Sequence, residues 1–276
     1  MAKTRLTITL DQDILKRVDS AIDGTKIRNR SHAIEYLLTT CLLPKSTKVL
    51  ILAGGEGVKF RPLTYELPKS LLPIKGKPLL EHTLSSLKAQ GLTDIYISTA
   101  HLGEKIEDYF GDGAKWGLRI KYLKQAEVKS GTAQPVLQAQ KEFTEPFIVI
   151  YGDVLTQVNY LDLLDFHNSH RGIATMALTS VEKPSMWGVA TIEGNRIKSF
   201  EEKPGKGKTR SHLINAGIYV LDPQVFKYIE PKSTRLEKDL FPRLASEGKL
   251  YAYPFEGQWY DVSTPQVYTE VMNSNI

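Results

Sequence analysis

The chain has 276 residues, of which 41% are hydrophobic and 24% are charged, and its formal net charge is +5. This composition is typical of a soluble globular protein with one large domain and a small appendage. The single cysteine, Cys41, excludes a disulfide framework, and no apolar run approaches the ~20 residues that a membrane span requires. We therefore expect a cytoplasmic protein that has no membrane partner.

The positive charge is concentrated near the N-terminal end. Residues 1–48 contain nine lysines and arginines against five aspartates and glutamates, whereas the rest of the chain is nearly neutral. A Pro-Lys-Ser-Thr segment at residues 44–47 is typical of a short linker. The sequence therefore predicts two domains, residues 1–44 and residues 45–276.

The first domain has a pattern of its own. Residues 4–10 alternate between polar and apolar side chains, which predicts a short, half-buried strand. Asp11 is a candidate N-cap for a helix that ends near Gly24, and Ser31 is a candidate N-cap for a second helix. This order of strand, helix, turn and helix resembles the ribbon-helix-helix DNA-binding fold, and residues 28–34 are similar to the start of that family's second helix.

The resemblance implies that two chains pair their strands into a ribbon that enters the major groove of DNA. Arg5, Thr7 and Thr9 would reach base edges from the polar face of the strand, and the amides beside Ser31 would hold a backbone phosphate. A unit of roughly 45 residues has too little core to be stable alone, so we expect a homodimer or a higher homo-oligomer. Dimerisation without DNA contact is the alternative.

A glycine-rich loop follows the apolar residues 49–52. Its sequence is Ala-Gly-Gly-Glu-Gly over residues 53–57, and Lys69 comes soon after it. Glycines let main-chain amides approach an anion closely because no Cβ atom stands in the way, and a lysine adds a point charge. The order of strand, loop and lysine predicts a cradle for the phosphates of a nucleotide.

Beyond this loop, apolar strands alternate with amphipathic helices. Such a rhythm is typical of an α/β domain with a mainly parallel, Rossmann-like sheet. The pattern predicts helices over residues 78–91, 105–110 and 133–143, and strands over residues 95–97, 118–123 and 147–150.

The last of these strands runs into Gly152 and Asp153. Ligands of open α/β sheets collect at the carboxyl ends of the strands, so Asp153 is placed to hold a metal ion. Carboxylate oxygens suit Mg²⁺, whereas the six histidines show no spacing typical of zinc sites. The sequence therefore predicts Asp153 as a magnesium ligand.

Three strings together resemble the sugar-1-phosphate nucleotidyltransferases. Residues 53–64 are similar to that family's Ala-Gly-Gly-x-Gly-Thr-Arg-Leu-x-Pro-Leu-Thr, and Pro68-Lys69 matches the Pro-Lys that follows it. Residues 257–265 are similar to Gly-x-Trp-x-Asp-Val-Gly-Thr-Pro, and residues 200–204 contain the family's Glu-Lys-Pro segment. The resemblance extends from residue 48 to residue 276, and it implies transfer of a nucleotidyl group to a sugar 1-phosphate.

The resemblance also implies a role for each matching position. Asp153 and Asp261 would bind Mg²⁺, Lys69 and Lys59 would grip the triphosphate, and Lys203 would meet the phosphate of the sugar. The remaining positions would line the nucleotide site (Ala53, Gly54, Gly55, Gly57, Gln125, Gly131 and Thr132) or the sugar site (Gly188, Glu202 and Asn215).

The chain departs from the family pattern at a few positions. Val58, Lys59 and Phe60 stand where the family has Thr, Arg and Leu, so the cation is kept but the bidentate guanidinium is lost. Arg61 is a candidate substitute for that arginine, and Ser263 replaces a usual glycine.

Gln125, followed by Gly131 and Thr132, resembles the segment in which a glutamine amide pairs with uracil or thymine in pyrimidine-using members. We therefore predict that UTP or dTTP donates the nucleotidyl group to a hexose 1-phosphate, with pyrophosphate as the second product. The alternative is a DNA-binding regulator whose transferase-like domain only senses a nucleotide or a sugar phosphate. The intact Asp153 and Asp261 favour the enzyme.

Overall fold

The computed structural model describes residues 7–22, 27–34, 38, 47–125, 131–205, 207 and 209–274. The chain divides into two compact units, Met1–Ser46 and Thr47–Ile276. The predicted domain boundary lies two residues before this division. In the part that the structure describes, no helix has the length and apolar character needed to cross a bilayer.

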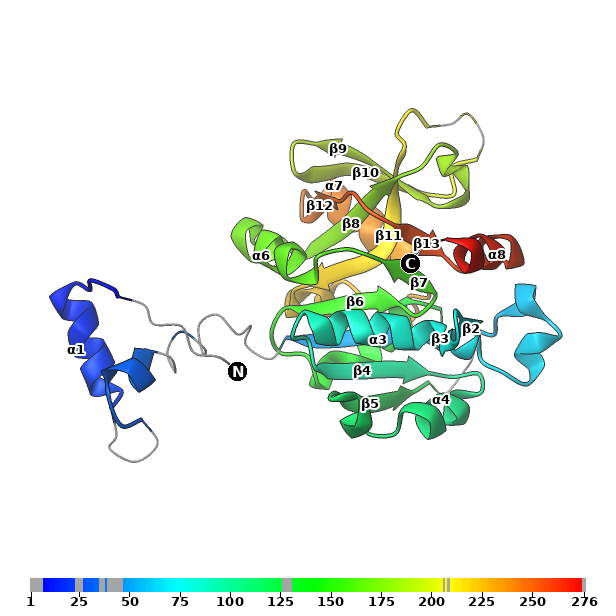
Figure 1. Ribbon diagram of the computed structural model, residues 1–276. Helices are drawn as coiled ribbons and strands as arrows, with labels where there is room; N and C mark the ends of the chain where they lie inside the picture. Colours follow the sequence, from blue (N-terminus) through cyan, green and yellow to red (C-terminus); the bar gives the residue numbers. More distant parts are fainter. Residues whose placement is uncertain are drawn as a thin grey trace. The chain divides into compact units, whose positions relative to one another are not determined.

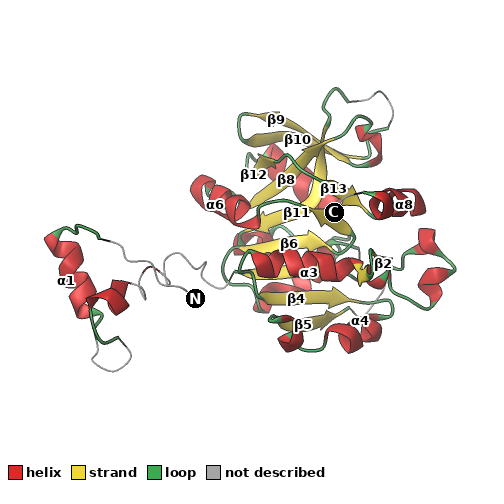
Figure 2. Ribbon diagram, in the orientation of Figure 1, coloured by secondary structure: helices red, strands yellow, loops and turns green. Residues whose placement is uncertain are grey.

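The larger unit is built on a nine-stranded sheet with the order β5-β4-β1-β6-β11-β8-β12-β10-β9. Figure 2 shows these strands at the centre of the unit, with helices on both sides. The strands are β1 (Lys48–Leu52), β4 (Asp94–Thr99), β5 (Arg119–Lys124), β6 (Phe147–Tyr151), β8 (Ala174–Ser180), β9 (Gly188–Glu193), β10 (Arg196–Glu202), β11 (Leu213–Leu221) and β12 (Leu250–Pro254).

The sheet is mixed, so the prediction of a mainly parallel sheet is wrong. β5, β4, β1 and β6 are parallel neighbours, and β12 is parallel to β8, but β11 runs antiparallel to β6, β8 and β9. A parallel connection needs a crossover of about a dozen residues or more. Only Gly194 and Asn195 separate β9 from β10, so these two strands pair as an antiparallel hairpin.

The two faces of the sheet carry separate apolar cores. In β1, Val49 and Ile51 pack on one face with Leu84 of α3, whereas Leu50 packs on the other face with Leu244 of α7. This alternation follows from the two-residue period of a strand. Figure 1 shows α3 lying over the sheet between β4 and β6. The helices are α3 (Leu79–Ala89), α4 (Gly103–Phe110), α5 (Ala133–Gln138), α6 (Tyr160–His170), α7 (Phe241–Ser246) and α8 (Pro265–Asn273).

Most of the elements predicted over residues 78–150 are confirmed in kind and place. α3, β4, α4, β5 and β6 each overlap the expected range. The helix expected over residues 133–143 is shorter, because α5 ends at Gln138 and the 3₁₀ helix Ala139–Lys141 follows. Such 3₁₀ turns are frequent at helix ends.

Two short ladders lie beside the main sheet. β2 (Pro73–Ile74) pairs with β3 (Lys77–Pro78), and β7 (Val154–Thr156) pairs with β13 (Trp259–Asp261). The second ladder is antiparallel, and Asp261 lies opposite Val154. It therefore connects the segment that follows β6 to a segment more than a hundred residues further along the chain.

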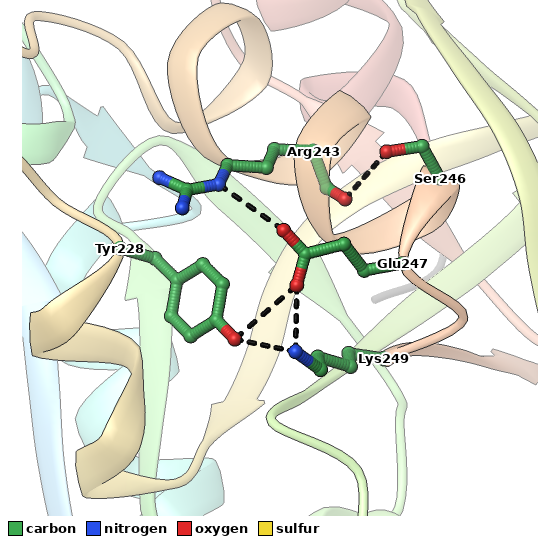
Figure 3. A network of polar contacts seen from close by, with 5 residues as sticks. All are labelled: Tyr228, Arg243, Ser246, Glu247 and Lys249. Atoms are coloured by element: carbon green, nitrogen blue, oxygen red, sulfur yellow. Dashed lines mark hydrogen bonds and ion pairs between the residues drawn. The ribbon is translucent and has the colours of Figure 1, made fainter.

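A network of polar contacts ties α7 to the residues before β12 (Figure 3). The Glu247 carboxylate accepts hydrogen bonds from Arg243 Nε at 3.2 Å, from Lys249 Nζ at 2.6 Å and from Tyr228 OH at 3.3 Å. The Ser246 hydroxyl donates to the Arg243 carbonyl at 2.8 Å. Because these groups lie at the surface, water screens their charges and each contact stabilises the fold only slightly.

In the smaller unit, α1 (Gln12–Ser20) begins at the predicted N-cap. The Asp11 carboxylate accepts a hydrogen bond from the Asp13 amide at 2.8 Å. The buried side chains of this unit that the structure describes are Val18, Ile27 and Ala33. Ile14 of the same helix is 52% exposed.

Two predictions for this unit are corrected. Residues 7–10 form no strand, since an isolated extended segment has no partner for its backbone hydrogen bonds within one chain. The second helix is capped by Asn29 and not by Ser31, because Asn29 Oδ1 accepts from the His32 amide at 2.9 Å. Arg5 and Gly24 lie outside the described residues. The ribbon-helix-helix assignment is thus a prediction and not a finding.

Candidate active site

The site lies where the parallel strands of the main sheet end. The glycine-rich loop follows β1, Gln125 follows β5, and Gly152 and Asp153 follow β6. Backbone hydrogen bonds continue past the strands, since the Gly152 amide donates to the Leu52 carbonyl at 2.9 Å. The carboxyl ends of parallel strands meet at one edge of a sheet, which brings these three segments together.

A first cavity of about 330 Å³ opens at this edge. It holds most of the predicted nucleotide-site residues together with Lys69 and Asp153. Its remaining walls come from segments later in the chain. Its lining includes Ala53, Gly54, Gly55, Lys69, Ser70, Gln125, Gly131, Thr132, Tyr151, Asp153, Glu202, Lys203, Arg235 and Glu237.

A second cavity of about 420 Å³ contains the predicted sugar-site residues Gly188, Glu202 and Asn215 and the second aspartate, Asp261. It also contains Lys59, Trp187 and Trp259. Five residues line both cavities, namely Tyr151, Asp153, Glu202, Lys203 and Glu237. The two hollows are therefore adjacent, and Asp153 stands on their common wall.

The glycines around the first cavity are there for different reasons. A Cβ atom on Gly54 would lie 2.5 Å from Gln125 Nε2, so Gly54 makes room for the glutamine side chain. Gly131 has φ +69°, and its Cβ would lie 2.0 Å from the Thr234 carbonyl oxygen. A Cβ on Gly55 would meet no protein atom within 4 Å. Gly55 thus leaves its backbone open toward a ligand, as a phosphate cradle requires.

Gly57 lies beside the first cavity without lining it. It has φ +63° and precedes the 3₁₀ helix Val58–Phe60. A Cβ there would lie 2.8 Å from Thr64 Cγ2 and 3.2 Å from Lys69 Cβ. Gly57 therefore shapes the turn and lets the segment carrying Lys69 pack closely.

Asp153 and Asp261 are brought together by the β7–β13 ladder. Asp261 pairs with Val154, and the Val262 amide donates to the Asp153 carbonyl at 2.8 Å. Asp153 forms an ion pair with Lys69. Burial, and next the negative charge of Asp153, raise the pKa of Asp261, while hydrogen bonds from Trp187 and Ser263 and the charge of Lys69 lower it. The two carboxylates therefore share one electrostatic environment.

This arrangement fits a divalent cation. Two adjacent, part-buried carboxylates lie beside the Lys69 ammonium group, and hard oxygen ligands are those that Mg²⁺ prefers. Within the described ranges, no group of three or more histidine, cysteine, aspartate or glutamate side chains forms a metal site. Mg²⁺ commonly needs only one or two carboxylates, because substrate phosphates and water supply the other ligands.

Lys59 lies in the wall of the second cavity and not in that of the first. The same cavity is lined by Asp153 and Asp261, whereas the predicted role of Lys59 is to grip the triphosphate. Arg61, the candidate substitute, lines neither cavity. Its guanidinium forms an ion pair with Glu56 at 2.8 Å and lies over the Tyr65 ring.

Strand pairing brings the predicted sugar-site residues together, since Glu202 lies opposite Gly188 in the β9–β10 hairpin. A Cβ on Gly188 would lie 2.3 Å from the Phe200 ring and 2.9 Å from Glu202 Oε2. Gly188 is therefore required by the packing of these side chains. Lys203 has φ +50° and forms an ion pair with Glu202 at 3.6 Å.

Asn215 is buried at an irregularity in the pairing of β11 with β8. Its Nδ2 donates to Tyr219 OH at 2.7 Å, and its Oδ1 accepts from the Gly217 amide at 2.9 Å. Part of its hydrogen-bonding capacity is thus used by the protein. Its predicted contact with the sugar has to use the second Nδ2 hydrogen or the remaining lone pair.

Glu237 is a further residue of the site that no sequence motif predicted. This residue is only 9% exposed and lies in a π-helical turn, Leu236–Leu240. Its carboxylate accepts a hydrogen bond from Thr132 Oγ1 at 2.8 Å and another from Tyr151 OH. Burial and the charge of Glu237 raise the pKa of Glu202. An acidic residue flanked by apolar Leu236 and Leu240 was the only signal that the sequence offered.

Ser70 was also missed. Its hydroxyl is buried and has no hydrogen-bond partner among the described residues, and Ser70 lines the first cavity beside Lys69. Buried polar groups nearly always have partners. A ligand in this cavity would offer one. The sequence places Ser70 next to the Pro-Lys pair, but burial was needed to single it out.

The predicted DNA-contacting residues belong to the smaller unit. Thr7, Thr9 and Ser31 are exposed, and Arg5 lies outside the described residues. Arg30, one of the basic residues of this unit, binds Asp19 in a bidentate ion pair with distances of 2.7 and 2.9 Å. DNA binding by this unit stays a prediction.

Comparison with known proteins places this site in context. Residues 48–275 match the sequence profile of the nucleotidyl transferase family. The chain is 38% identical over 228 residues to a protein of Oryza sativa subsp. japonica named probable mannose-1-phosphate guanylyltransferase 2. The matched region covers 80% of this chain and 62% of that protein. The chain thus matches less than two thirds of the length of this relative.

Solved structures share the fold. A protein of Bacillus anthracis assigned as a glucose-1-phosphate thymidylyltransferase, crystallised with sucrose, has a TM-score of 0.73 and 27% identity, with 83% of this chain and 97% of that chain covered. A UDP-glucose pyrophosphorylase complexed with UDP-glucose has a TM-score of 0.72 and 25% identity, with 82% and 97% covered. On the extent of the matched profile and the identity to its relatives, this chain belongs to the nucleotidyl transferase family.

Proposed function

We propose that this protein transfers a nucleotidyl group from a nucleoside triphosphate to a sugar 1-phosphate and releases pyrophosphate. The observation that carries the proposal is the pair of adjacent cavities that share Asp153, Glu202 and Lys203. One cavity is bordered by a glycine-rich loop suited to phosphates, and the other by Gly188 and Asn215. A nucleotide and a sugar phosphate held in them would meet at the common wall.

The proposed chemistry needs no nucleophilic side chain. A phosphate oxygen of the sugar phosphate attacks the α-phosphorus in line, a new P–O bond forms, and the bond to the pyrophosphate oxygen breaks. The attacking phosphate is already ionised at neutral pH, so we assign no general base. The work of the protein is to position both substrates and to stabilise the charge that shifts toward the leaving group.

Lys69 and Lys203 both line the first cavity and supply positive charge there. In the described structure Lys69 is paired with Asp153, so it is already oriented toward the reacting centre. Asp153 and Asp261 would hold Mg²⁺, which when bound neutralises phosphate charge at the transfer step. Lys59 lines the second cavity, so we propose that it acts near the sugar phosphate or the metal site.

The choice of nucleotide is a finer proposal. Gln125, on which the prediction of UTP or dTTP rests, donates to Ser98 Oγ at 2.9 Å, so part of its amide is engaged. The curated relatives at 35% to 38% identity are named mannose-1-phosphate guanylyltransferases. They are more similar to this chain than the thymidylyl- and uridylyl-using structures are. We therefore propose GTP and mannose 1-phosphate as the preferred pair, in place of the pyrimidine nucleotides.

A pyrophosphate-release assay tests the proposal. The full chain is given GTP, UTP, dTTP, ATP or CTP with mannose 1-phosphate or glucose 1-phosphate, in the presence of Mg²⁺. We expect turnover with a preference for GTP and mannose 1-phosphate, and a loss of at least about a thousandfold in Asp153→Asn. Preference for UTP or dTTP would restore the first prediction. Absence of turnover with every pair would favour a domain that only senses its ligands.

A further inference from the structure

Trp187 lines the second cavity and directly precedes β9 in the chain. Its indole Nε1 donates a hydrogen bond to Oδ2 of Asp261 at 2.9 Å, across 74 residues of chain. No motif in the sequence connects these two residues. The contact exists only because β9 and β13 are brought to the same cavity.

Backbone hydrogen bonds and a ring contact hold Trp187 in place. The Trp187 amide donates to the Pro184 carbonyl at 3.0 Å, and the Trp187 carbonyl accepts from the Lys203 amide at 3.1 Å. Its ring packs edge to face on Trp259, with ring centres 5.9 Å apart and an interplanar angle of 70°. Trp259 is itself fixed, because its Nε1 donates to the Ala216 carbonyl at 2.9 Å.

An indole N–H is a donor only, and it is neutral. It therefore orients a carboxylate without competing as a metal ligand and without adding a charge that would repel a cation. The other candidate ligand is held differently, because Asp153 is paired with the Lys69 ammonium. Some residues hydrogen-bond to a metal ligand without binding the metal themselves. Removing such a residue typically lowers metal affinity by about 10- to 100-fold.

We propose that Trp187 is a positioning residue that holds the Asp261 carboxylate in place for the divalent cation, through its indole N–H. This inference rests on the proposed function, since it requires that Asp153 and Asp261 bind the metal. It adds a specific role for a residue that contributes no ligand atom. It also predicts that the Trp187 indole senses occupancy of the site.

The first test measures Mn²⁺ affinity of the full chain by electron paramagnetic resonance, without nucleotide. Trp187→Phe keeps an aromatic ring and removes the N–H, and we expect affinity to fall by about tenfold. Trp116→Phe is the matched control, because Trp116 lines neither cavity, and it is expected to bind as the unmodified protein does. Asp261→Asn is expected to abolish binding.

The outcomes separate this inference from the proposed function. If Asp261→Asn binds Mn²⁺ as well as the unmodified protein, the metal site itself is wrong. If Asp261→Asn loses binding but Trp187→Phe retains full affinity, the metal site stands and the role of Trp187 is overturned.

A second measurement does not depend on the folding of Trp187→Phe. The chain contains three tryptophans, so its nitrogen-15 spectrum contains three indole N–H signals, and Trp116→Phe and Trp259→Phe assign them by elimination. We expect Mg²⁺ to shift the Trp187 signal and to leave the Trp116 signal in place. A Trp187 signal that stays unmoved while Mg²⁺ binds would contradict the proposal.

Discussion

At the scale of single residues, the site depends on what the absence or presence of one side chain permits. Gly55 and Gly131 both line the first cavity. A methyl group would meet no protein atom within 4 Å at Gly55, whereas at Gly131 it would collide with Thr234. Asp153 and Asp261 illustrate the same dependence for charge, because burial and then the charge of Asp153 raise the pKa of Asp261. Small local changes should therefore separate effects on folding from effects on ligand binding.

Gly55→Ala is expected to leave the thermal midpoint unchanged, because its Cβ would meet no protein atom within 4 Å. The same methyl group should obstruct the nucleotide phosphates and weaken binding by about tenfold or more. Gly131→Ala should instead lower the thermal midpoint, since its φ is +69° and its Cβ would collide with Thr234. Thermal unfolding measures the midpoint of each variant, and calorimetric titration measures its affinity for the nucleotide. Equal loss of stability in the two variants would contradict the assignment of Gly55.

His167 should make stability depend on pH. Burial lowers its pKa from 6.5 to about 4, while the charge of Asp222 opposes this, and its Nδ1 lies 2.9 Å from Thr175 Oγ1. Between these pH values the unfolded chain binds a proton that the folded chain does not. The free energy of unfolding should therefore fall as pH drops from 6.5 to 4, by about 3 kcal/mol at most.

Urea unfolding at pH 7.5, 6 and 5 measures this effect, with His167→Gln as the comparison. The variant cannot titrate at this position, so its stability should change less over the same pH range. Parallel pH profiles of the two proteins would show that His167 is not responsible.

At the scale of elements, strand ends and short ladders position the site. The β7–β13 ladder places Asp261 beside Asp153, and the β9–β10 hairpin places Glu202 beside Gly188. The π-helical turn Leu236–Leu240 brings Glu237 into hydrogen-bond contact with both Thr132 and Tyr151. Single π-helical turns are rare and often occur at functional sites, so we expect this turn to matter for substrate binding.

Removing the Glu237 carboxylate should leave the part-buried hydroxyl donors of Thr132 and Tyr151 without their acceptor. We expect Glu237→Ala to lower the free energy of unfolding by roughly 2 to 4 kcal/mol. Glu237→Gln, which keeps an acceptor, should be less harmful to stability but should raise the KM for the nucleotide. Urea unfolding and steady-state kinetics measure these effects.

Glu247→Ala is a suitable comparison, because Glu247 also accepts several hydrogen bonds but lies at the surface (Figure 3). It should barely change the urea midpoint. The importance assigned to the π-helical turn would be refuted if Glu237→Ala were as mild as Glu247→Ala.

At the scale of the whole molecule, the two units carry separate features. Every residue that lines the two cavities lies between residues 52 and 267, in the larger unit. The smaller unit has a described core of three buried side chains and exposes Ile8 and Ile14. The exposed apolar side chains offer a surface on which a second copy can pack. Residues 1–48 also carry an excess of positive charge.

A fragment of residues 47–276 is therefore expected to retain the turnover of the full chain, within about threefold, in the pyrophosphate-release assay. Loss of turnover in the fragment would contradict this separation of the two units.

The full chain should bind duplex DNA in a salt-sensitive manner, and Arg5→Ala should weaken this binding. The full chain should also self-associate through its first 46 residues. Light scattering and fluorescence anisotropy measure these properties. If the fragment bound DNA as tightly as the full chain, the prediction that the smaller unit binds DNA would be wrong.

The sequence by itself determined the family, the glycine-rich loop, the strand that leads to Asp153, and helices such as α3, because these depend on local spacing along the chain. Only the tertiary structure decided the mixed sheet, the place of Lys59 in the second cavity, and the contacts of Glu237 and Trp187. Those contacts join residues 74 to 105 positions apart. Local patterns cannot specify them, because strand pairing and burial are set by packing between distant segments.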